Sequence, residues 1–264
     1  MAYGLTQSAD LEAGSSQYFS RADTASLSIT GNYTVEAWIK LESTPSGGGV
    51  YPICMKNDAG SNRSTNFVLQ ESGGNVLLSF GVDETGNNSD TSSVDYIWNP
   101  STGVWYHVAG VFTAATGAVE LFVDGSSVAS NTGTATAIYD GGASTYIGFQ
   151  GGTSRYFDGR ISLVRVWSTN RSGAQLTADK CNVLGATANL AAEWTLDNTV
   201  NDNSGNANTL TNNNSVTFGA DVPAVCAVAG PTTVKTWDGV TQSTGIKTYF
   251  GVDLANVKSV DGAT

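Results

Sequence analysis

Charged residues are scarce in this chain, and basic ones are the scarcest. Only 13% of its 264 residues are charged, where an average soluble domain has about 25%. Twelve lysines and arginines stand against 23 aspartates and glutamates, which gives a net charge of −11. Nucleic acids and anionic membrane surfaces are therefore excluded as partners, because both require clustered basic side chains. Glycine, serine, threonine and asparagine fill the deficit, so we expect a polar, mostly neutral surface.

Long hydrophobic runs are also missing. No stretch approaches the roughly 18 apolar residues of a membrane span, so we expect no membrane insertion. The opening residues, MAYGLTQSADLEAG, lack the charged and then apolar pattern of a secretion signal. We therefore expect no signal peptide in this chain and interpret residues 1–14 as a short N-terminal arm.

Cysteine is limited to three residues, so at most one disulfide forms within the chain. Cys181 and Cys226 flank the last part of the predicted domain and either pair with each other or stay reduced, because connectivity cannot be read from sequence. Cys54 lies inside the apolar run VYPICMKN, which predicts a buried thiol.

Short alternating runs of apolar and polar residues are present throughout, separated by turns rich in Gly, Asn, Ser and Asp. In the clearest of them, Val104 to Gly125, both faces of a hairpin carry large side chains, which predicts a position inside a stack of two sheets. The chain is therefore all-β. One helical turn is expected at residues 172–181, with Ser172 as its cap. Further strands are predicted at residues 17–21, 33–41, 50–56, 66–70, 76–82, 94–98, 126–129, 145–150, 160–167 and 191–196.

The tail, residues 223–264, differs from the rest and repeats one short pattern three times after two prolines. Each repeat unit joins Val or Ile, Lys and Thr or Ser to a later glycine, and each is too small to bury a core alone. We interpret it as a linker and a β-rich tail for assembly or attachment, in a homo-oligomer. The assembly residues are Val234, Lys235, Ile246, Lys247, Val257 and Lys258.

Four blocks in order carry a family resemblance: FSRADTASLSITGNYTVEAWIKLES, VWYHVAGVFTAATGAVELFVDGSSVA, FDGRISLVRVWSTNRSGAQLTADKC and LAAEWTLDNTVNDNSGNANTLT. They resemble the laminin-G-like, or concanavalin A-like lectin and glucanase, domains. The resemblance implies a two-sheet antiparallel jelly-roll sandwich over residues 15–222. The tail resembles short C-terminal repeats of phage and other surface proteins.

Catalytic carboxylates are not recognisable in the chain. Glycoside hydrolases that resemble this fold use paired carboxylates on one strand, since acid–base cleavage by retaining enzymes needs two carboxyl groups about 5 Å apart. No E-x-D-x-x-E cluster occurs, and Ser162 and Leu163 stand where the family often has acidic residues. His107, the one histidine, has no partner for a catalytic triad and is interpreted as structural. We therefore expect no enzyme.

One strand face is a candidate glycan site. In YTVEAWIK, the residues Thr34, Glu36, Trp38 and Lys40 share one side of the strand. A tryptophan among polar side chains suits a sugar platform, because the ring binds the apolar face of a pyranose while the polar groups bind its hydroxyls. The alternative is that Trp38 fills the sandwich or lies under a loop.

Two oxygen-rich loops are candidate calcium sites, since calcium takes six to eight oxygen ligands. The first contains Asp83 and Asp90. The second contains Asp202, Ser204, Asn206 and Asn208. The alternative for both is an Asx turn, in which the side chains bond their own backbone.

Three functions fit these patterns. The leading hypothesis is a non-enzymatic, lectin-like module that decorates or attaches an extracellular surface or virion, with glycans and other subunits as partners. The second is a carbohydrate-binding module of a secreted glycanase. The third is a purely structural capsid or fibre component.

Overall fold

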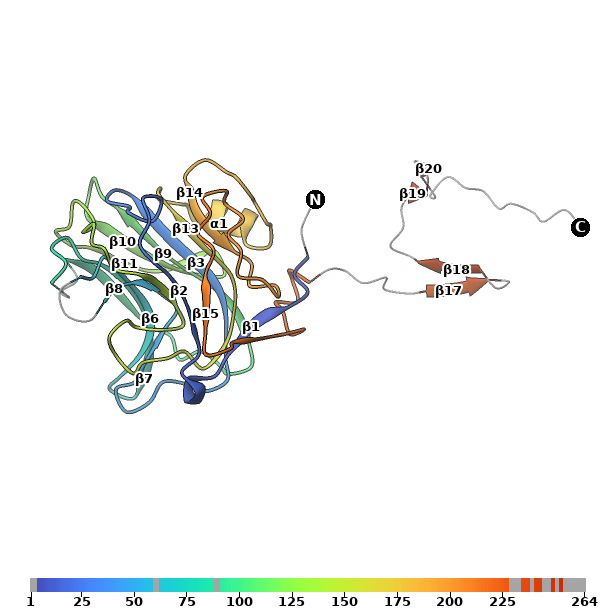
Figure 1. Ribbon diagram of the computed structural model, residues 1–264, viewed down its shortest axis with the longest axis horizontal. Helices are drawn as coiled ribbons and strands as arrows, with labels where there is room; N and C mark the ends of the chain where they lie inside the picture. Colours follow the sequence, from blue (N-terminus) through green and yellow to red (C-terminus); the bar gives the residue numbers. More distant parts are fainter. Residues whose placement is uncertain are drawn as a thin grey trace, which may run out of the picture. The chain divides into compact units, whose positions relative to one another are not determined.

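The chain forms two compact units, Met1–Cys226 and Ala227–Thr264. The computed structural model describes residues 4–58, 62–87 and 91–227, and after them the strand backbones at 234–237, 240–243, 248–249 and 252–253. The first unit is a sandwich of two sheets with one short helix outside it (Figure 1). All its paired strands run antiparallel, so the all-β, two-sheet jelly-roll prediction is confirmed.

The first sheet has eight strands in the order β11-β10-β9-β3-β13-β1-β16, with β14 paired to β13. The central strand β3 pairs with β9 on one side and with β13 on the other. Residues 8–11, within the segment interpreted as an arm, form a strand of this sheet between β13 and β16. The bounds are β1 (Ser8–Leu11), β3 (Tyr33–Leu41), β9 (Trp105–Thr113), β10 (Ala118–Val123), β11 (Ser126–Thr132), β13 (Gly159–Trp167), β14 (Leu190–Trp194) and β16 (Thr217–Gly219).

The second sheet has the order β15-β2-β12-β5-β6-β7-β8, with β4 paired to β6. The strand predicted at residues 50–56 is two strands, β4 and β5, separated at Ile53. The bounds are β2 (Tyr18–Arg21), β4 (Val50–Pro52), β5 (Cys54–Lys56), β6 (Thr65–Ser72), β7 (Asn75–Val82), β8 (Ser92–Ile97), β12 (Thr145–Ile147) and β15 (Thr211–Asn213).

The hairpin of β9 and β10 is buried on both faces, as its pattern predicts. Val108 and Phe112 belong to the main core between the sheets, whereas Ala109 and Val111 pack with Leu176 of the helix α1 (Gly173–Asp179). Gly110 faces the ring of Phe80, and a Cβ there would lie only 2.5 Å from ring atoms. The packing of Phe80 against this strand therefore requires glycine at position 110.

The structure answers the predictions on the helix cap and on the three cysteines. Ser172 caps α1 in a capping box with Gln175, which confirms the predicted helix start. Cys181 and Cys226 form a disulfide, which decides between the two alternatives. Cys54 is a free, buried thiol on β5, as expected.

The second unit contains two short hairpins. One joins β17 (Val234–Trp237) to β18 (Val240–Ser243), and the other joins β19 (Thr248–Tyr249) to β20 (Val252–Asp253). Val234 and Lys235 of the expected assembly residues lie on β17. Ile246, Lys247, Val257 and Lys258 lie outside the described residues, so the role of the tail in assembly stays a prediction.

Candidate functional site

The strand face predicted as a sugar platform is covered in the structure. Thr34, Glu36 and Trp38 are buried, and Trp38 is only 3% exposed. The cover consists of the loop between β13 and α1, α1 itself, the loop that follows it and the chain segment at residues 221–226. Each candidate residue bonds to one of these or to β13. The platform interpretation is therefore wrong, and the alternative of a structural tryptophan under a loop is correct.

Glu36 belongs to a buried ion network. Its Oε1 accepts a hydrogen bond from Trp167 Nε1 at 2.8 Å and lies 3.4 Å from Arg165 Nη1. Arg165 Nε also donates to Glu193 Oε1 at 2.8 Å, and all three charged side chains are fully buried. Burial alone would raise the pKa of Glu36, but the guanidinium and its hydrogen-bond donors lower it to about 2. Glu36 is therefore charged at neutral pH, and the network acts as structure.

His107 lies in the same interior, as its interpretation as a structural residue implies. It is buried, with Nε2 3.0 Å from Glu36 Oε2 and its ring 5.3 Å from that of Trp38. The Glu36 carboxylate beside it is already bonded by Arg165 and Trp167.

Trp38 and Lys40 hold the covering segments in place. Trp38 Nε1 donates to the carbonyl oxygen of Lys180 at 2.6 Å. Lys40 forms an ion pair with Asp221, which also accepts a 2.9 Å hydrogen bond from Trp105 Nε1. Burial alone would raise the pKa of Asp221, but these donors hold it below its usual range. The predicted ligand face is thus an attachment face for the chain's own C-terminal segment.

The loop at residues 202–208 is a self-bonded turn. Asp202 Oδ1 accepts from the backbone N–H groups of Glu193 and Ser204, and Oδ2 accepts from Ser204 Oγ and from the N–H of Asn208. Asn208 Oδ1 accepts from Thr24 Oγ1. Because protein donors bond these oxygens, the loop has the geometry of the Asx-turn alternative, and calcium binding here stays a prediction.

The loop that begins at Asp83 has the same character. Asp83 Oδ1 accepts hydrogen bonds from Thr85 N, Thr85 Oγ1 and Gly86 N. The carboxylate therefore closes an Asx turn over the next three residues. Asp90, the other expected ligand, lies outside the described residues, so a calcium site that uses both stays untested.

An open groove of about 590 Å³ lies among four loops of the sandwich. They are the β2–β3 connection, the start of the loop after β13, the segment before β14 and the Asx turn at residues 202–208. None of its fifteen described lining residues is charged, and most carry a hydroxyl or an amide. The polar ones are Ser26, Ser28, Thr30, Asn32, Ser168, Thr187, Asn189, Ser204 and Asn206.

Two residues of the groove belong to a predicted site of another kind, the calcium loop. Ser204 and Asn206 were calcium candidates, and the structure places both in the groove wall. Most of the other lining residues were missed. The available signal was the run SLSITGN, residues 26–32, in which small hydroxyl-bearing residues alternate with apolar ones. The remaining lining comes from distant segments that no local pattern connects.

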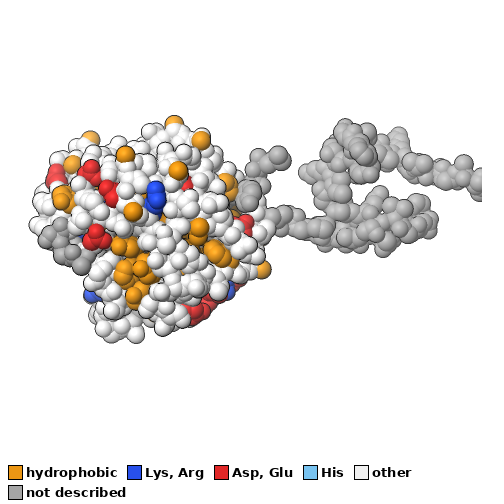
Figure 2. All heavy atoms as spheres, in the orientation of Figure 1, with side chains coloured by type: hydrophobic (Ala, Val, Ile, Leu, Met, Phe, Trp, Pro, Cys, Tyr) orange, Lys and Arg blue, Asp and Glu red, His pale blue; other side chains and the backbone are white. Residues whose placement is uncertain are grey.

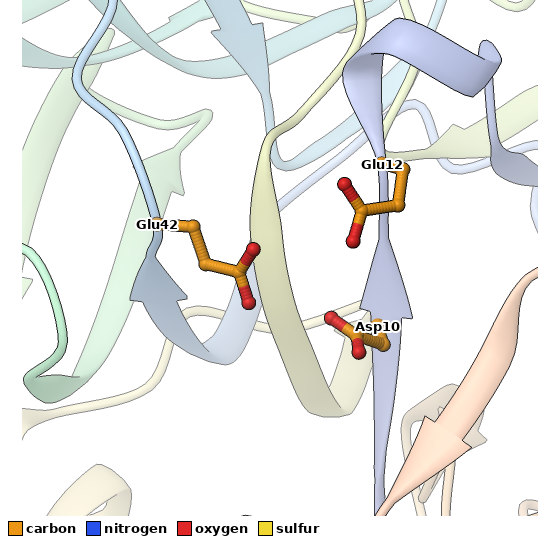
Figure 3. Close-up of side chains that lie close together, drawn as sticks. All are labelled: Asp10, Glu12 and Glu42. Atoms are coloured by element: carbon orange, nitrogen blue, oxygen red, sulfur yellow. The ribbon is translucent and has the colours of Figure 1, made fainter.

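Three carboxylates meet where the strands β1 and β3 of the first sheet end (Figure 3). Asp10 and Glu12 lie on and just after β1, and Glu42 follows β3, with oxygen atoms within 4.8 Å of one another. Among the described residues, these three acidic side chains are the ones that lie close enough together to bind a single metal ion. Asp10 is also paired to Arg160 Nη2 at 2.6 Å. Burial and the negative charges of Asp10 and Glu12 raise the pKa of Glu42. The positive charge of Arg160 therefore does not balance all the negative charge of the three carboxylates.

Replacing Glu42 by Gln is expected to stabilise the protein at neutral pH. Because the pKa of Glu42 is raised by folding, its ionisation opposes folding above that pKa, and the penalty disappears as the pH falls below about 4. For an exposed group screened by solvent, we expect a melting temperature about 1–3 °C higher at pH 7. Differential scanning fluorimetry at pH 7 and pH 4 measures the effect. A variant less stable than the parent at pH 7 would contradict the like-charge account.

The fold is a two-sheet jelly roll. The family profile described as the concanavalin A-like lectin/glucanases superfamily matches residues 13–177, more than half of the chain. The protein therefore belongs to this superfamily, as the four sequence blocks predicted. No curated protein matches the sequence. Within the described residues, no helix is long and apolar enough to cross a membrane.

Solved structures share the fold at low identity. A candidate carbohydrate-binding protein from Bacteroides ovatus has a TM-score of 0.66 and 21% identity, over 82% of this chain and 60% of that one. The heptameric SAP-like pentraxin of Limulus polyphemus has a TM-score of 0.57 and 15% identity, over 86% of this chain and 99% of that one. The CBM40 of Ruminococcus gnavus IT-sialidase, bound to α2,3 sialyllactose, has a TM-score of 0.49 and 16% identity, over 66% and 98%. The chain thus spans 60% of the Bacteroides protein's length.

Proposed function

We propose that this protein is a non-enzymatic, lectin-like module that binds neutral glycans in the open groove. The observation that carries the proposal is the lining of the groove, which combines hydroxyls and amides with no charge. A sugar exchanges hydrogen bonds with water for hydrogen bonds with such groups, so neutral donors and acceptors serve it well. Sialylated or sulfated glycans would require a cationic partner, which this lining lacks.

The size of the groove fits one or two sugar rings. Its volume of about 590 Å³ lies within the roughly 300–1,000 Å³ of small-molecule sites. Ile29 and Leu190 add apolar contacts of the kind that the C–H face of a pyranose needs. The site therefore offers both kinds of surface that a saccharide presents.

The groove wall is held rigid by the Asx turn. Asn206 Nδ2 donates to the carbonyl oxygens of Leu190 and Ala191, at 3.0 and 3.1 Å. Ser204 Oγ lies 3.2 Å from the Ala191 carbonyl oxygen. These bonds fix the turn to β14 before any ligand arrives, and pre-organisation lowers the entropic cost of binding.

The binding test is a bulky substitution at an exposed alanine of the wall. Ala186→Trp places an indole in the groove, so we expect at least a tenfold loss of affinity for neutral oligosaccharides on a glycan array and by calorimetry. Ala115→Trp, in the exposed turn between β9 and β10, is the matched control and should bind as the parent does. Unchanged binding in Ala186→Trp, or binding of sialylated glycans alone, would contradict the proposal.

The second unit supplies the attachment part of the proposal. We assign residues 223–264 to assembly on an extracellular surface or virion, through the repeated pattern that includes Val234, Lys235, Ile246, Lys247, Val257 and Lys258. The support is the repetition itself and the small size of each unit, which favours packing against other subunits. Light scattering should show an oligomer for the full chain and a monomer for a chain ended at residue 226; a monomeric full chain would contradict the assignment.

A further inference from the structure

An aromatic cluster lies on the outer face of the second sheet, apart from the groove lining. Tyr18 on β2 and Tyr146 on β12 alternate with Phe19 and Ile147, which belong to the core. Because neighbouring strand residues point to opposite faces, both tyrosines point outward. The ring of Phe149 contacts the rings of both Tyr18 and Tyr156. Hydrophobic side chains gather on the visible face where β2 and β6 lie (Figure 2).

The rings form a fixed arrangement around Phe149. Tyr18 lies 4.5 Å from Phe149 between ring centres, and Tyr156 lies 4.9 Å from it with planes 21° apart. Tyr146 meets the same ring edge-on at 5.2 Å. Phe149 is 9% exposed, whereas the three tyrosines are half-buried. The cluster therefore presents tyrosine rings and hydroxyls to solvent over a phenylalanine base.

The hairpin that carries Phe149 and Tyr156 is closed by its own bonds. The two residues form an isolated β-bridge, and the N–H of Gln150 donates to the Arg155 carbonyl at 3.2 Å. Arg155 Nη1 donates to Gln150 Oε1 at 2.9 Å. On the other side of the cluster, Tyr146 Oη donates to Asp58 Oδ1 at 3.3 Å. These contacts fix the rings before a ligand binds.

Polar groups flank the rings on the neighbouring strand. Asn213 of β15 lies opposite Tyr18, and Ser20 lies opposite Tyr146. Asn213 Nδ2 donates to Ser20 Oγ at 2.9 Å. Aromatic faces next to an amide and hydroxyls provide the two kinds of contact that a pyranose requires.

We infer that this tyrosine cluster is a second saccharide-binding surface, which holds a further part of a neutral glycan chain. The inference rests on the proposed glycan-binding function but uses different residues. Its area favours a sugar over a protein partner. An aromatic side chain buries about 150–250 Å² when fully covered, and these rings are already half covered, whereas a stable protein interface needs about 800 Å² from each partner.

The composition of the surface leads to the same ligand. A lipid surface would be met by exposed aliphatic side chains, but the large exposed hydrophobic residues of the described chain are Ile97, Val104 and Val225, none of which belongs to the cluster. One or two stacked sugar rings match three partly exposed tyrosines.

The test uses affinity electrophoresis of the full chain in gels that contain a neutral β-glucan, xylan or galactomannan. Tyr156→Ala removes one end of the cluster and should weaken retention of the bound polysaccharide at least tenfold, and Tyr156→Phe by a smaller factor because the ring remains. Ile97→Ala, which removes an exposed apolar side chain at the β8 edge of the same sheet, should be retained as the parent is. Ala186→Trp run in parallel reports on the groove.

Nitration by tetranitromethane, read by mass spectrometry, provides a measurement on the unmutated protein. Saturating polysaccharide should protect Tyr18 and Tyr156 while Tyr96 on β8 is nitrated as before. Full retention of Tyr156→Ala, or no protection of Tyr18 and Tyr156, would overturn the inference and leave the groove intact as a site. If the parent retains none of the polysaccharides and oligosaccharides, the proposed function and the inference both fail.

Discussion

Replacing Glu36 by Gln is expected to lower the free energy of unfolding by about 3–5 kcal/mol, the usual cost of breaking a buried ion pair from one side. The substitution keeps the shape of the side chain but leaves Arg165 with one carboxylate fewer in a fully buried position. Glutamine still accepts the Trp167 hydrogen bond, so the loss reports mainly on charge.

Urea unfolding monitored by tryptophan fluorescence measures this change, with Glu120→Gln as the matched control. Glu120 bonds Ser127 on the outer strands and should cost less than 1 kcal/mol when neutralised. A loss below 1 kcal/mol for Glu36→Gln would show that the network does not carry the expected energy.

The pH dependence provides an independent check on the same residue. The folded pKa of Glu36, about 2, lies below its ordinary value of 4.5. Its ionisation therefore stabilises the fold fully above about pH 4.5, and this contribution is lost as the pH falls toward 2. The parent should lose stability across that window, and Glu36→Gln should lose less. Parallel curves would contradict the assignment of the acid sensitivity to this carboxylate.

Removing the Cys181–Cys226 disulfide by a double Ser substitution is the other large expected effect. The cysteines are 45 residues apart, and closing a loop of that length stabilises a fold by about 4 kcal/mol through the entropy of the unfolded chain. The reduced state also loses the fixed contact between Cys226 and the Leu5, Trp38 and Leu163 cluster.

Reduction of the parent supplies the control for this prediction. Dithiothreitol should lower the stability of the parent to that of the double Ser variant and leave the variant unchanged. Cys54 is a free, buried thiol and should not contribute to the difference. An equal stability of parent and variant under oxidising conditions would contradict the role given to the disulfide.

On the strand β3, the sequence predicts which side chains share a face but not that this face is covered. Alternation assigned Thr34, Glu36, Trp38 and Lys40 to one side of a strand, and the structure agrees. Their cover could not be read locally, because Lys180 and Asp221 lie more than 140 residues further along the chain. Burial here depends on tertiary contacts, which no strand pattern records.

The groove was less predictable than the fold for the same reason. Strand periodicity and turns are local properties, so most strands of the two sheets were found. The groove is shared by four loops, and its residues carry no charge or metal-ligand spacing that would mark a site. The Asx turn was found as a pattern, but its donors, such as Glu193 N and Thr24 Oγ1, come from other elements.

The disulfide lies at the last residue of the sandwich, immediately before the second unit begins at Ala227. Cys226 is also bonded through its carbonyl oxygen to the N–H of Leu5 at 2.9 Å, and Asp221 is tied to Lys40 on the central strand. A force that pulls on the second unit is therefore carried first by the disulfide to Cys181, just after α1, before it acts on any strand of the sandwich. The jelly roll can bear a pull on its C-terminal extension without being peeled open from β16.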